Sequence, residues 1–111
     1  MMLRRSFAIA ALGATLAVSS ANAQPQGYAL TIRNHKFEPT ELVLPASEKI
    51  ELKVTNADPT VEEFESPSLH REKIVPPGQT VSVFIGPLRP GRYEFFGDFN
   101  PTTARGVIVV K

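Results

Sequence analysis

Apolar and polar residues alternate along most of the chain beyond residue 23, as they do in β-strands that bury one face. In residues 49–55 the alternation has no fault, and it places Ile50, Leu52 and Val54 on the same side. Further segments show this alternation or a short apolar run: residues 28–33, 42–44, 73–75, 81–85, 93–95 and 107–110. Proline and glycine turns separate them, and no stretch keeps a helical apolar repeat long enough for an ordinary helix. The sequence therefore predicts an all-β sandwich of roughly seven to eight strands.

The first 23 residues have the composition of an export leader. Arg4 and Arg5 form a basic start, an apolar stretch follows in residues 7–18, and Ala21-Asn22-Ala23 resembles a signal-peptidase site. The apolar stretch is too short to span a bilayer. We therefore predict a signal peptide over residues 1–23 and one exported domain, not embedded in the membrane, over residues 24–111. The basic start fits either an ordinary secretory leader or, because two arginines precede Ser6 and Phe7, a twin-arginine signal.

The net charge and the cysteine content exclude several classes of function. Without the two leader arginines, ten basic residues face eleven acidic ones, and this balance gives no support for nucleic-acid binding. The chain contains no cysteine, so it has neither a disulfide nor a thiolate ligand for a metal. No serine or histidine stands in a pattern typical of a nucleophilic catalyst, and we predict that the protein is not an enzyme.

Residues 93–106 resemble the last hairpin of the cupredoxins, the small blue-copper proteins. In that family the hairpin carries alternating aromatic residues, a cysteine, a histidine three residues later and, after a short spacer, a methionine before a glycine. Here Gly97 stands at the cysteine position, Asn100 stands at the histidine position, and the spacer has no methionine. A type 1 copper centre needs a thiolate and imidazoles. The resemblance therefore predicts the fold without its copper centre.

A second segment, residues 56–62, resembles the loop in which cupredoxins carry their first histidine ligand, and it places Glu62 at that position. Alternation alone fits an immunoglobulin-like sandwich nearly as well, but the two matches together favour a cupredoxin-like Greek-key sandwich. Several motifs are similar to the EfeO/FtrB type of cupredoxin-like domain: residues 34–39, 62–66, 71–73, 87–91 and 95–99. This resemblance implies a periplasmic protein that works with components of an inner-membrane iron-uptake system. Asn100 departs from that type, which commonly carries a histidine there.

Acidic residues gather at one place, and no lysine or arginine interrupts them. Four of the eleven carboxylates lie close together in the sequence: Asp58, Glu62, Glu63 and Glu65. If residues 63–65 are extended, Glu63 and Glu65 lie on one face about 6.6 Å apart, with Phe64 turned into the core. Two carboxylates at this spacing repel each other unless a cation lies between them. The cupredoxin resemblance also implies that the loop carrying Asp98 lies at the same end of the sandwich as Glu62.

These residues favour a metal site, and its predicted ligands are Glu62, Glu63, Glu65, Asp98 and His35. Oxygen donors suit iron, manganese, magnesium and calcium, whereas a histidine shifts the preference toward iron or copper(II). The predicted cofactor is therefore iron or copper(II). Two structural alternatives stay open: the carboxylates can form a solvated rim that protects a strand edge, and His35 can be a hydrogen-bonded turn residue. His70 lies beside Arg71 and is predicted to be exposed.

Two functions are compatible with the sequence. The first is an exported metal-handling module that binds iron or copper(II) and assists periplasmic iron uptake. The second is a metal-free interaction domain that docks a periplasmic or membrane partner through its loops, and Asn100 in place of histidine favours it. The metal, the partner and the oligomeric state do not follow from the sequence, which is compatible with a small homo-oligomer.

Overall fold

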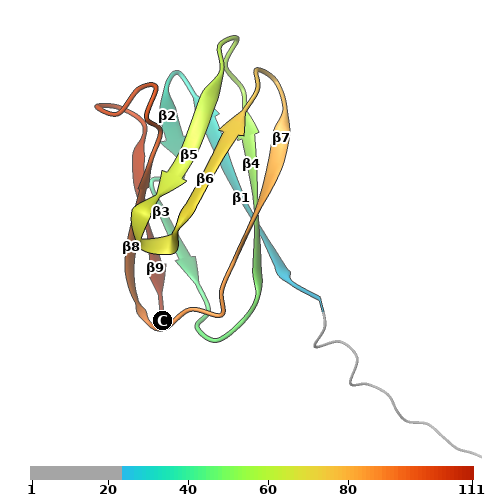
Figure 1. The fold of residues 1–111 in the computed structure, drawn as a ribbon, viewed down its shortest axis with the longest axis vertical. Coiled ribbons are helices and arrows are strands. Elements are labelled where there is room, and N and C mark those ends of the chain that lie inside the picture. Colours follow the sequence, from blue (N-terminus) through green and yellow to red (C-terminus); the bar gives the residue numbers. More distant parts are fainter. Residues whose placement is uncertain (1–23) are drawn as a thin grey trace, which may run out of the picture.

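The computed structural model describes residues 24–111, which form two β-sheets packed face to face (Figure 1). The predicted signal peptide lies outside the described residues. The strands are β1 (Gln26–Arg33), β2 (Lys36–Glu38), β3 (Glu41–Leu44), β4 (Ile50–Asn56), β5 (Glu62–Ser66), β6 (Arg71–Val75), β7 (Thr80–Ile85), β8 (Gly91–Phe96) and β9 (Arg105–Val110). One sheet has the order β2-β1-β4-β7, and the other has the order β3-β9-β8-β5-β6. The predicted all-β sandwich is confirmed.

The described region has nine strands, and the alternation in the sequence does not mark all of them. Strand β2 has only three residues, which is too short for a periodic signal. Strand β5 reads Glu-Glu-Phe-Glu-Ser, so its only apolar residue is Phe64. β1 pairs with β4 in parallel, and β3 pairs with β9 in parallel, so the chain crosses between the sheets rather than forming a simple meander.

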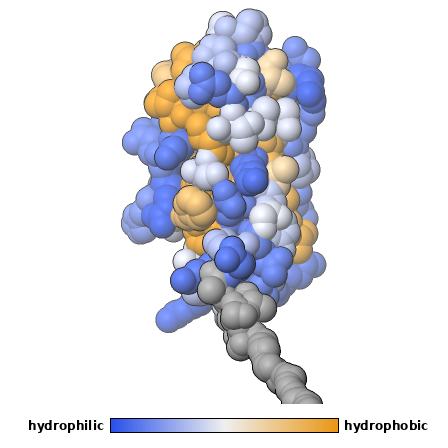
Figure 2. All heavy atoms as spheres, turned by 90° about the vertical axis from the view of Figure 1, so that its right-hand side faces the viewer, coloured by the Kyte–Doolittle hydropathy of each residue, from blue (hydrophilic) through white to orange (hydrophobic). Residues whose placement is uncertain are grey.

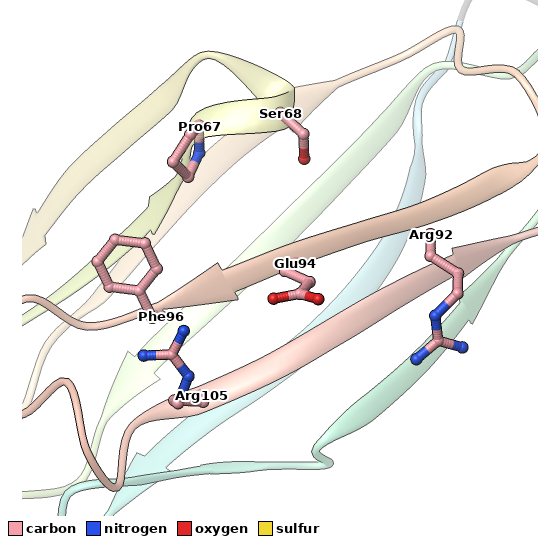
Figure 3. Close-up of a pocket in the computed structure, with 6 residues that line it drawn as sticks. All are labelled: Pro67, Ser68, Arg92, Glu94, Phe96 and Arg105. Carbon is pink, nitrogen blue, oxygen red and sulfur yellow. The ribbon is translucent and has the colours of Figure 1, made fainter.

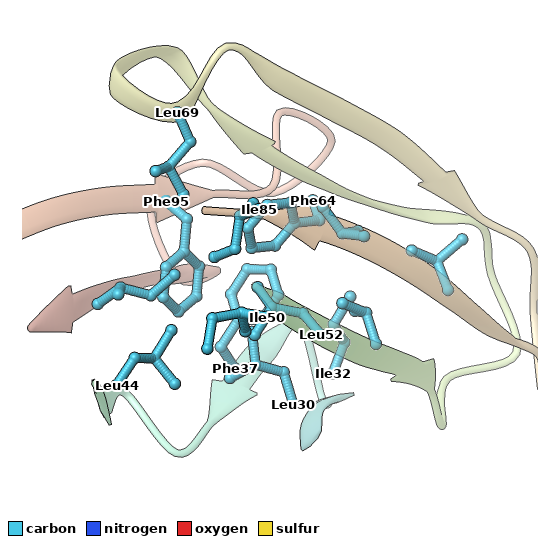
Figure 4. Packing of buried hydrophobic residues seen from close by; sticks show 14 of the residues in the cluster. Leu30, Ile32, Phe37, Leu44, Ile50, Leu52, Phe64, Leu69, Ile85 and Phe95 are labelled. Carbon is cyan, nitrogen blue, oxygen red and sulfur yellow. The ribbon is translucent and has the colours of Figure 1, made fainter. Parts of the chain in front are cut away.

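The core lies between the two sheets and is built from the inward-facing residues of the strands (Figure 4). Phe37, Phe64 and Phe95 are among its largest fully buried side chains. The ring of Phe95 lies 4.8 Å from that of Phe37, edge to face, and 5.3 Å from that of Phe64, stacked. Burial of each ring stabilises the fold by about 1.5–3 kcal/mol. Because Phe37 comes from the four-stranded sheet and the other two come from the five-stranded sheet, this contact holds the sheets together.

Strand β5 determines how the acidic residues are arranged. Glu62, Phe64 and Ser66 face the interior, and each has 0% of its surface exposed. The predicted inward position of Phe64 is therefore confirmed. Because successive side chains of a strand point to opposite faces, Glu63 and Glu65 lie on the outer side of the five-stranded sheet.

The surface is mixed in polarity. Figure 2 shows the side that lies on the right in Figure 1: hydrophilic residues cover much of it, and an apolar area lies toward its upper left. Among the described residues, the large hydrophobic side chains that are exposed come from several strands and loops: Val43, Val61, Ile74, Phe84 and Phe99. Within residues 24–111, no helix is long and apolar enough to cross a membrane.

Candidate metal centre

Three segments meet at the end of the sandwich that lies uppermost in Figure 1: the β1–β2 turn, the β4–β5 loop (residues 57–61) and the β8–β9 loop (residues 97–104). In the turn, Asn34 and His35 both have positive φ angles, 54° and 60°. Two successive left-handed residues are typical of the tightest β-hairpin turns, and asparagine and histidine tolerate this conformation better than most residues. The turn therefore presents His35 at the end of the sandwich.

Asp58 connects this turn to the β4–β5 loop by two hydrogen bonds. Its Oδ1 accepts the backbone N–H of Asn34 at 2.7 Å, and its Oδ2 accepts the backbone N–H of His35 at 2.9 Å. Burial alone would raise the pKa of the Asp58 carboxyl, but the hydrogen bonds from His35 and Asn34 outweigh it and hold this pKa below its ordinary value. Asp58 is only 6% exposed, so the carboxylate is a buried negative charge.

A buried amide orders the loop that carries Asp58. The side-chain oxygen of Asn56 accepts the N–H of Asp58 at 2.8 Å. Its Nδ2 donates to the carbonyls of Thr60 at 2.8 Å and Val75 at 3.0 Å. Asn56 is fully buried, and all three bonds satisfy polar groups that would otherwise be costly to bury. The position of Asp58 is therefore fixed by the fold.

Glu62 completes the cluster from the first position of β5. Its Oε2 lies 2.6 Å from Nδ1 of His35, and its Oε1 accepts a hydrogen bond from Nδ2 of Asn100 at 3.1 Å. Nδ1 of His35 also lies 3.6 Å from Oδ2 of Asp58. His35, Asp58 and Glu62 thus offer three ligand atoms within 4.8 Å of one another.

The charges of this cluster do not balance. Asp58 and Glu62 are both buried, while His35 is 46% exposed and is the only ion-pair partner of either carboxylate in residues 24–111. Buried carboxylates normally require a paired cation or a metal, because their desolvation is costly. With both carboxylates ionised, one imidazole leaves the cluster a negative charge, which a bound cation would compensate.

The five residues predicted as metal ligands do not form one cluster. The structure brings His35 and Glu62 together, but it places Glu63 and Glu65 on the opposite face of β5, where Glu72 joins them within 4.8 Å. Asp98 belongs to neither cluster among the described residues, and its backbone N–H donates to Oε1 of Glu63 at 2.7 Å. The prediction of one cluster is wrong because the alternation of side chains in β5 divides neighbouring carboxylates between two faces.

Two members of these clusters were not predicted as ligands. Asp58 belongs to the acidic segment, but its convergence with His35 depends on the β1–β2 turn, which the three residues of β2 do not reveal in the sequence. Glu72 lies directly opposite Glu65 in the antiparallel pair of β5 and β6. The register of that pair could have revealed Glu72, if the turn at residues 67–70 had been recognised. His70 is exposed, as predicted.

Glu63 is almost fully buried, at 3% exposure, so it does not belong to a solvated rim. The pKa of its carboxyl is raised to about 7, chiefly by burial and also by the neighbouring Glu72 and Glu65, while the hydrogen bond from the N–H of Asp98 opposes the shift. The ordinary value is 4.5, so between these two values the folded protein holds more protons than the unfolded chain. The free energy of unfolding must therefore fall as the pH rises through this window.

Replacing Glu63 by glutamine should remove this loss of stability. We expect wild type to lose about 1 kcal/mol between about pH 5 and pH 8, which is less than the full pKa shift would give because the cluster adjoins solvent. Glu63→Gln should lose much less, since an amide does not titrate there. Urea unfolding at both pH values measures the difference, with Glu48→Gln in the exposed β3–β4 turn as control. Equal pH dependence in wild type and Glu63→Gln would contradict this assignment.

The fold agrees with the comparisons. A family model described as a cupredoxin-like domain matches residues 6–110. The chain belongs to this family. A relative, protein RP394 of Rickettsia prowazekii (strain Madrid E), is 53% identical over 81 residues, which are 73% of this chain and 65% of that protein. The chain thus spans slightly less than two thirds of this relative's length.

Solved cupredoxin structures share the fold. Auracyanin A, a blue copper protein from Chloroflexus aurantiacus, superposes with a TM-score of 0.69 at 13% identity, covering 79% of this chain and 100% of its own. The metal-binding domain of the Cu(I)-exporting ATPase CopA from Streptococcus pneumoniae D39 gives 0.68 at 15% identity, covering 77% and 84%. The purple cupredoxin from Nitrosopumilus maritimus gives 0.60 at 16% identity, covering 75% and 98%. At these identities the likeness shows the fold alone.

The residues of this cupredoxin-like chain do not fit a type 1 copper centre. The chain has no cysteine, and Gly97 stands where the family resemblance places one. A Cβ at Gly97 would lie 2.8 Å from the carbonyl oxygen of Glu63 and 3.2 Å from Cβ of Ala104, so the backbone leaves no room for a side chain there. The other two positions carry Glu62 and Asn100, which are hydrogen-bonded to each other. The end of the sandwich therefore offers oxygen donors and one imidazole.

Proposed function

We propose that this cupredoxin-like protein binds iron or copper(II) at its sandwich end through His35, Asp58 and Glu62. The observation that carries the proposal is the convergence of two buried carboxylates and one imidazole, with ligand atoms within 4.8 Å of one another. Mixed oxygen and nitrogen donors suit iron and copper(II) better than calcium or magnesium, which prefer oxygen alone. A metal there would neutralise the negative charge that His35 leaves uncompensated.

The resemblance of several motifs to the EfeO/FtrB type supports a more specific role, in which the protein is exported to the periplasm and assists ferrous-iron uptake with membrane-bound partners. The leader-like composition of residues 1–23 supports export. A metal-handling role needs reversible binding, and a site with one imidazole and no thiolate holds metal less firmly than a type 1 centre. We therefore propose transfer of a metal ion rather than electron transfer.

A metal-free interaction domain is the second candidate function, and the hydrogen bonds of the cluster favour it. Both oxygens of Asp58 accept backbone N–H groups. Both oxygens of Glu62 have side-chain partners, which are His35 and Asn100. These hydrogen bonds also give the cluster a purely structural role, in which it connects three loops. In that case the loops around it, including exposed Val61 and Phe99, would serve as the docking surface.

The two histidines of the chain provide a matched test of these alternatives. His35 and His70 both have left-handed backbones, with φ angles of 60° and 55°, and asparagine tolerates this conformation. His35→Asn should weaken binding of Fe(II), measured anaerobically by calorimetry, by about 10- to 100-fold, because it removes the only nitrogen ligand. His70→Asn should bind Fe(II) like wild type. Equal affinity of the two variants, or no Fe(II) and no Cu(II) binding by wild type, would favour the interaction domain.

A further inference from the structure

The two sheets together have four edge strands, and β7 differs from the other three. The edge strands β2, β3 and β6 have three to five residues, and each carries at least one charged side chain. β7 has six residues, reads Thr-Val-Ser-Val-Phe-Ile and carries neither a charge nor a proline. Short length, charged side chains and proline are features that keep an edge strand from pairing with another chain. Within residues 24–111, β7 is therefore the edge strand that lacks them.

The backbone of β7 exposes a row of hydrogen-bonding groups. The N–H of Asn56 in β4 donates to the carbonyl of Gln79 at 2.8 Å, so Gln79 directs its backbone groups toward β4. In an antiparallel pair this direction alternates from residue to residue, so alternate residues of β7 point away from β4: Thr80, Ser82 and Phe84. Arg71 of the other sheet agrees with this assignment, because its Nε donates to the carbonyl of Phe84 at 2.8 Å. A carbonyl oxygen has two lone pairs, so that of Phe84 can accept a second hydrogen bond.

This edge is accessible to a partner. β7 lies at the right-hand margin of the sandwich in Figure 1, beyond β6, and Figure 2 looks onto this side of the molecule. Phe84 is 55% exposed, more than any other large hydrophobic side chain in residues 24–111. On the inner side of β7, Val81 is only half-buried. A strand added at this edge would cover apolar side chains together with the free backbone groups.

We propose that β7 pairs with β7 of a second copy of the chain, antiparallel and about a two-fold axis that passes through the edge at Ser82. Ser82 of one copy then lies opposite Ser82 of the other, and Thr80 lies opposite Phe84. In each of these pairs both residues direct their backbone groups toward the partner copy, so they exchange N–H···O=C hydrogen bonds. The two four-stranded sheets become one continuous sheet. The pairing is independent of any metal at the sandwich end.

A two-fold pairing must be self-complementary, and the uncharged edge of β7 meets this requirement. Its donors and acceptors form the same row from either end, and no like charges meet. The outer face of the five-stranded sheet differs, because Arg92 and Glu94 both belong to β8 and an axis along that strand would oppose each to its own copy. The groove on that face is lined by residues of both charges (Figure 3): Pro67, Ser68, Arg92, Glu94, Phe96 and Arg105.

The expected dimer is weak but insensitive to salt. One pair of six-residue strands buries less than a standard interface of about 800 Å² per partner, as is typical of transient association. We therefore expect a dissociation constant of about 10–100 µM. Salt at about 1 M should not weaken the dimer, because its contacts are backbone hydrogen bonds and apolar side chains rather than ion pairs. Sedimentation velocity of the purified protein from about 1 to 500 µM, at low and high salt, covers this range.

Charges placed at the axis test the pairing. Ser82→Lys and Ser82→Glu should each weaken self-association at least about tenfold, because residue 82 lies opposite itself and like charges then meet. An equimolar mixture of the two variants should dimerise again, since lysine then lies opposite glutamate. Ala29→Glu is the matched control and should dimerise like wild type. Ala29 of β1 and Ser82 of β7 both lie opposite Lys53 of β4, but only Ser82 lies at the edge.

Dimer formation in the mixture also excludes misfolding as the cause of the losses in the single variants, and circular dichroism checks the folding of each variant alone. A wild-type protein that stays monomeric at the highest concentration would overturn the proposal. Single variants at position 82 that dimerise like wild type would also overturn it, as would a mixture that stays monomeric or a loss of dimerisation in Ala29→Glu as large as in Ser82→Glu.

Discussion

Replacing Glu62 by glutamine should weaken the binding of Fe(II) and Cu(II) by about 100-fold or more, equivalent to about 2.7 kcal/mol. Glu62 is fully buried and is the residue through which His35 and Asn100 are connected. Its carboxylate supplies a charged oxygen in a place that solvent does not reach. An amide oxygen of the same shape is a neutral and much weaker ligand. Competitive titration with a chelator at one pH measures the change.

The same substitution should leave the fold intact. Glutamine keeps the size of Glu62, and its side-chain oxygen can still accept the hydrogen bond from Asn100. Circular dichroism and thermal unfolding should therefore show a stable apo protein. Glu48→Gln, in the β3–β4 turn at the other end of the sandwich (Figure 1), is the matched control and should retain full affinity. Wild-type affinity in a folded Glu62→Gln variant would exclude Glu62 as a ligand.

Asn100→His should raise Cu(II) affinity by at least about tenfold, or roughly 1.4 kcal/mol. Nδ2 of Asn100 lies 3.1 Å from Oε1 of Glu62, so a histidine at this position would bring a second imidazole to the edge of the cluster. Neutral imidazoles are among the strongest ligands for Cu(II) in proteins. The backbone of the β8–β9 loop should tolerate the change, because the carbonyl of Asn100 accepts the N–H groups of Thr103 and Ala104 independently of the side chain.

Asn100→Gln provides the control for this gain. It retains an amide, so it should not bind Cu(II) more tightly than wild type, whereas Asn100→His should. Circular dichroism must show equal folding of the three proteins. If Asn100→His and Asn100→Gln bound Cu(II) equally, position 100 would not face the metal.

The strands and their inward faces could be predicted because burial of one face leaves a period of two in the sequence. Ile50, Leu52 and Val54 show this directly, and all three are core residues. The positions of Glu62 and Asn100 at the sandwich end could be inferred from the cupredoxin-like spacing of two loops. The hydrogen bond between their side chains agrees with that inference.

The composition of the cluster could not be predicted in the same way, because it depends on contacts between distant segments. Asp58 lies beside His35 because it accepts the N–H groups of a turn formed by two left-handed residues, Asn34 and His35. Glu62 and Glu63 are neighbours in sequence, yet the pleat of β5 places them on opposite faces. The burial of Glu63 depends on the β8–β9 loop, whose Asp98 N–H reaches its carboxylate. Local sequence carries no signal for the contacts of Asp58 with His35 and of Asp98 with Glu63, whereas the alternation around Phe64 does separate Glu63 and Glu65 from Glu62.

Metal analysis of the protein purified from its own host tests the central claim most directly. Elemental analysis of wild type, prepared without chelators, should find about one iron or copper ion per chain, and Glu62→Gln prepared in parallel should contain almost none. Equal expression and folding of the two proteins make the comparison valid. Wild-type protein with neither iron nor copper, which also binds neither metal when it is supplied, would contradict a metal centre at His35, Asp58 and Glu62.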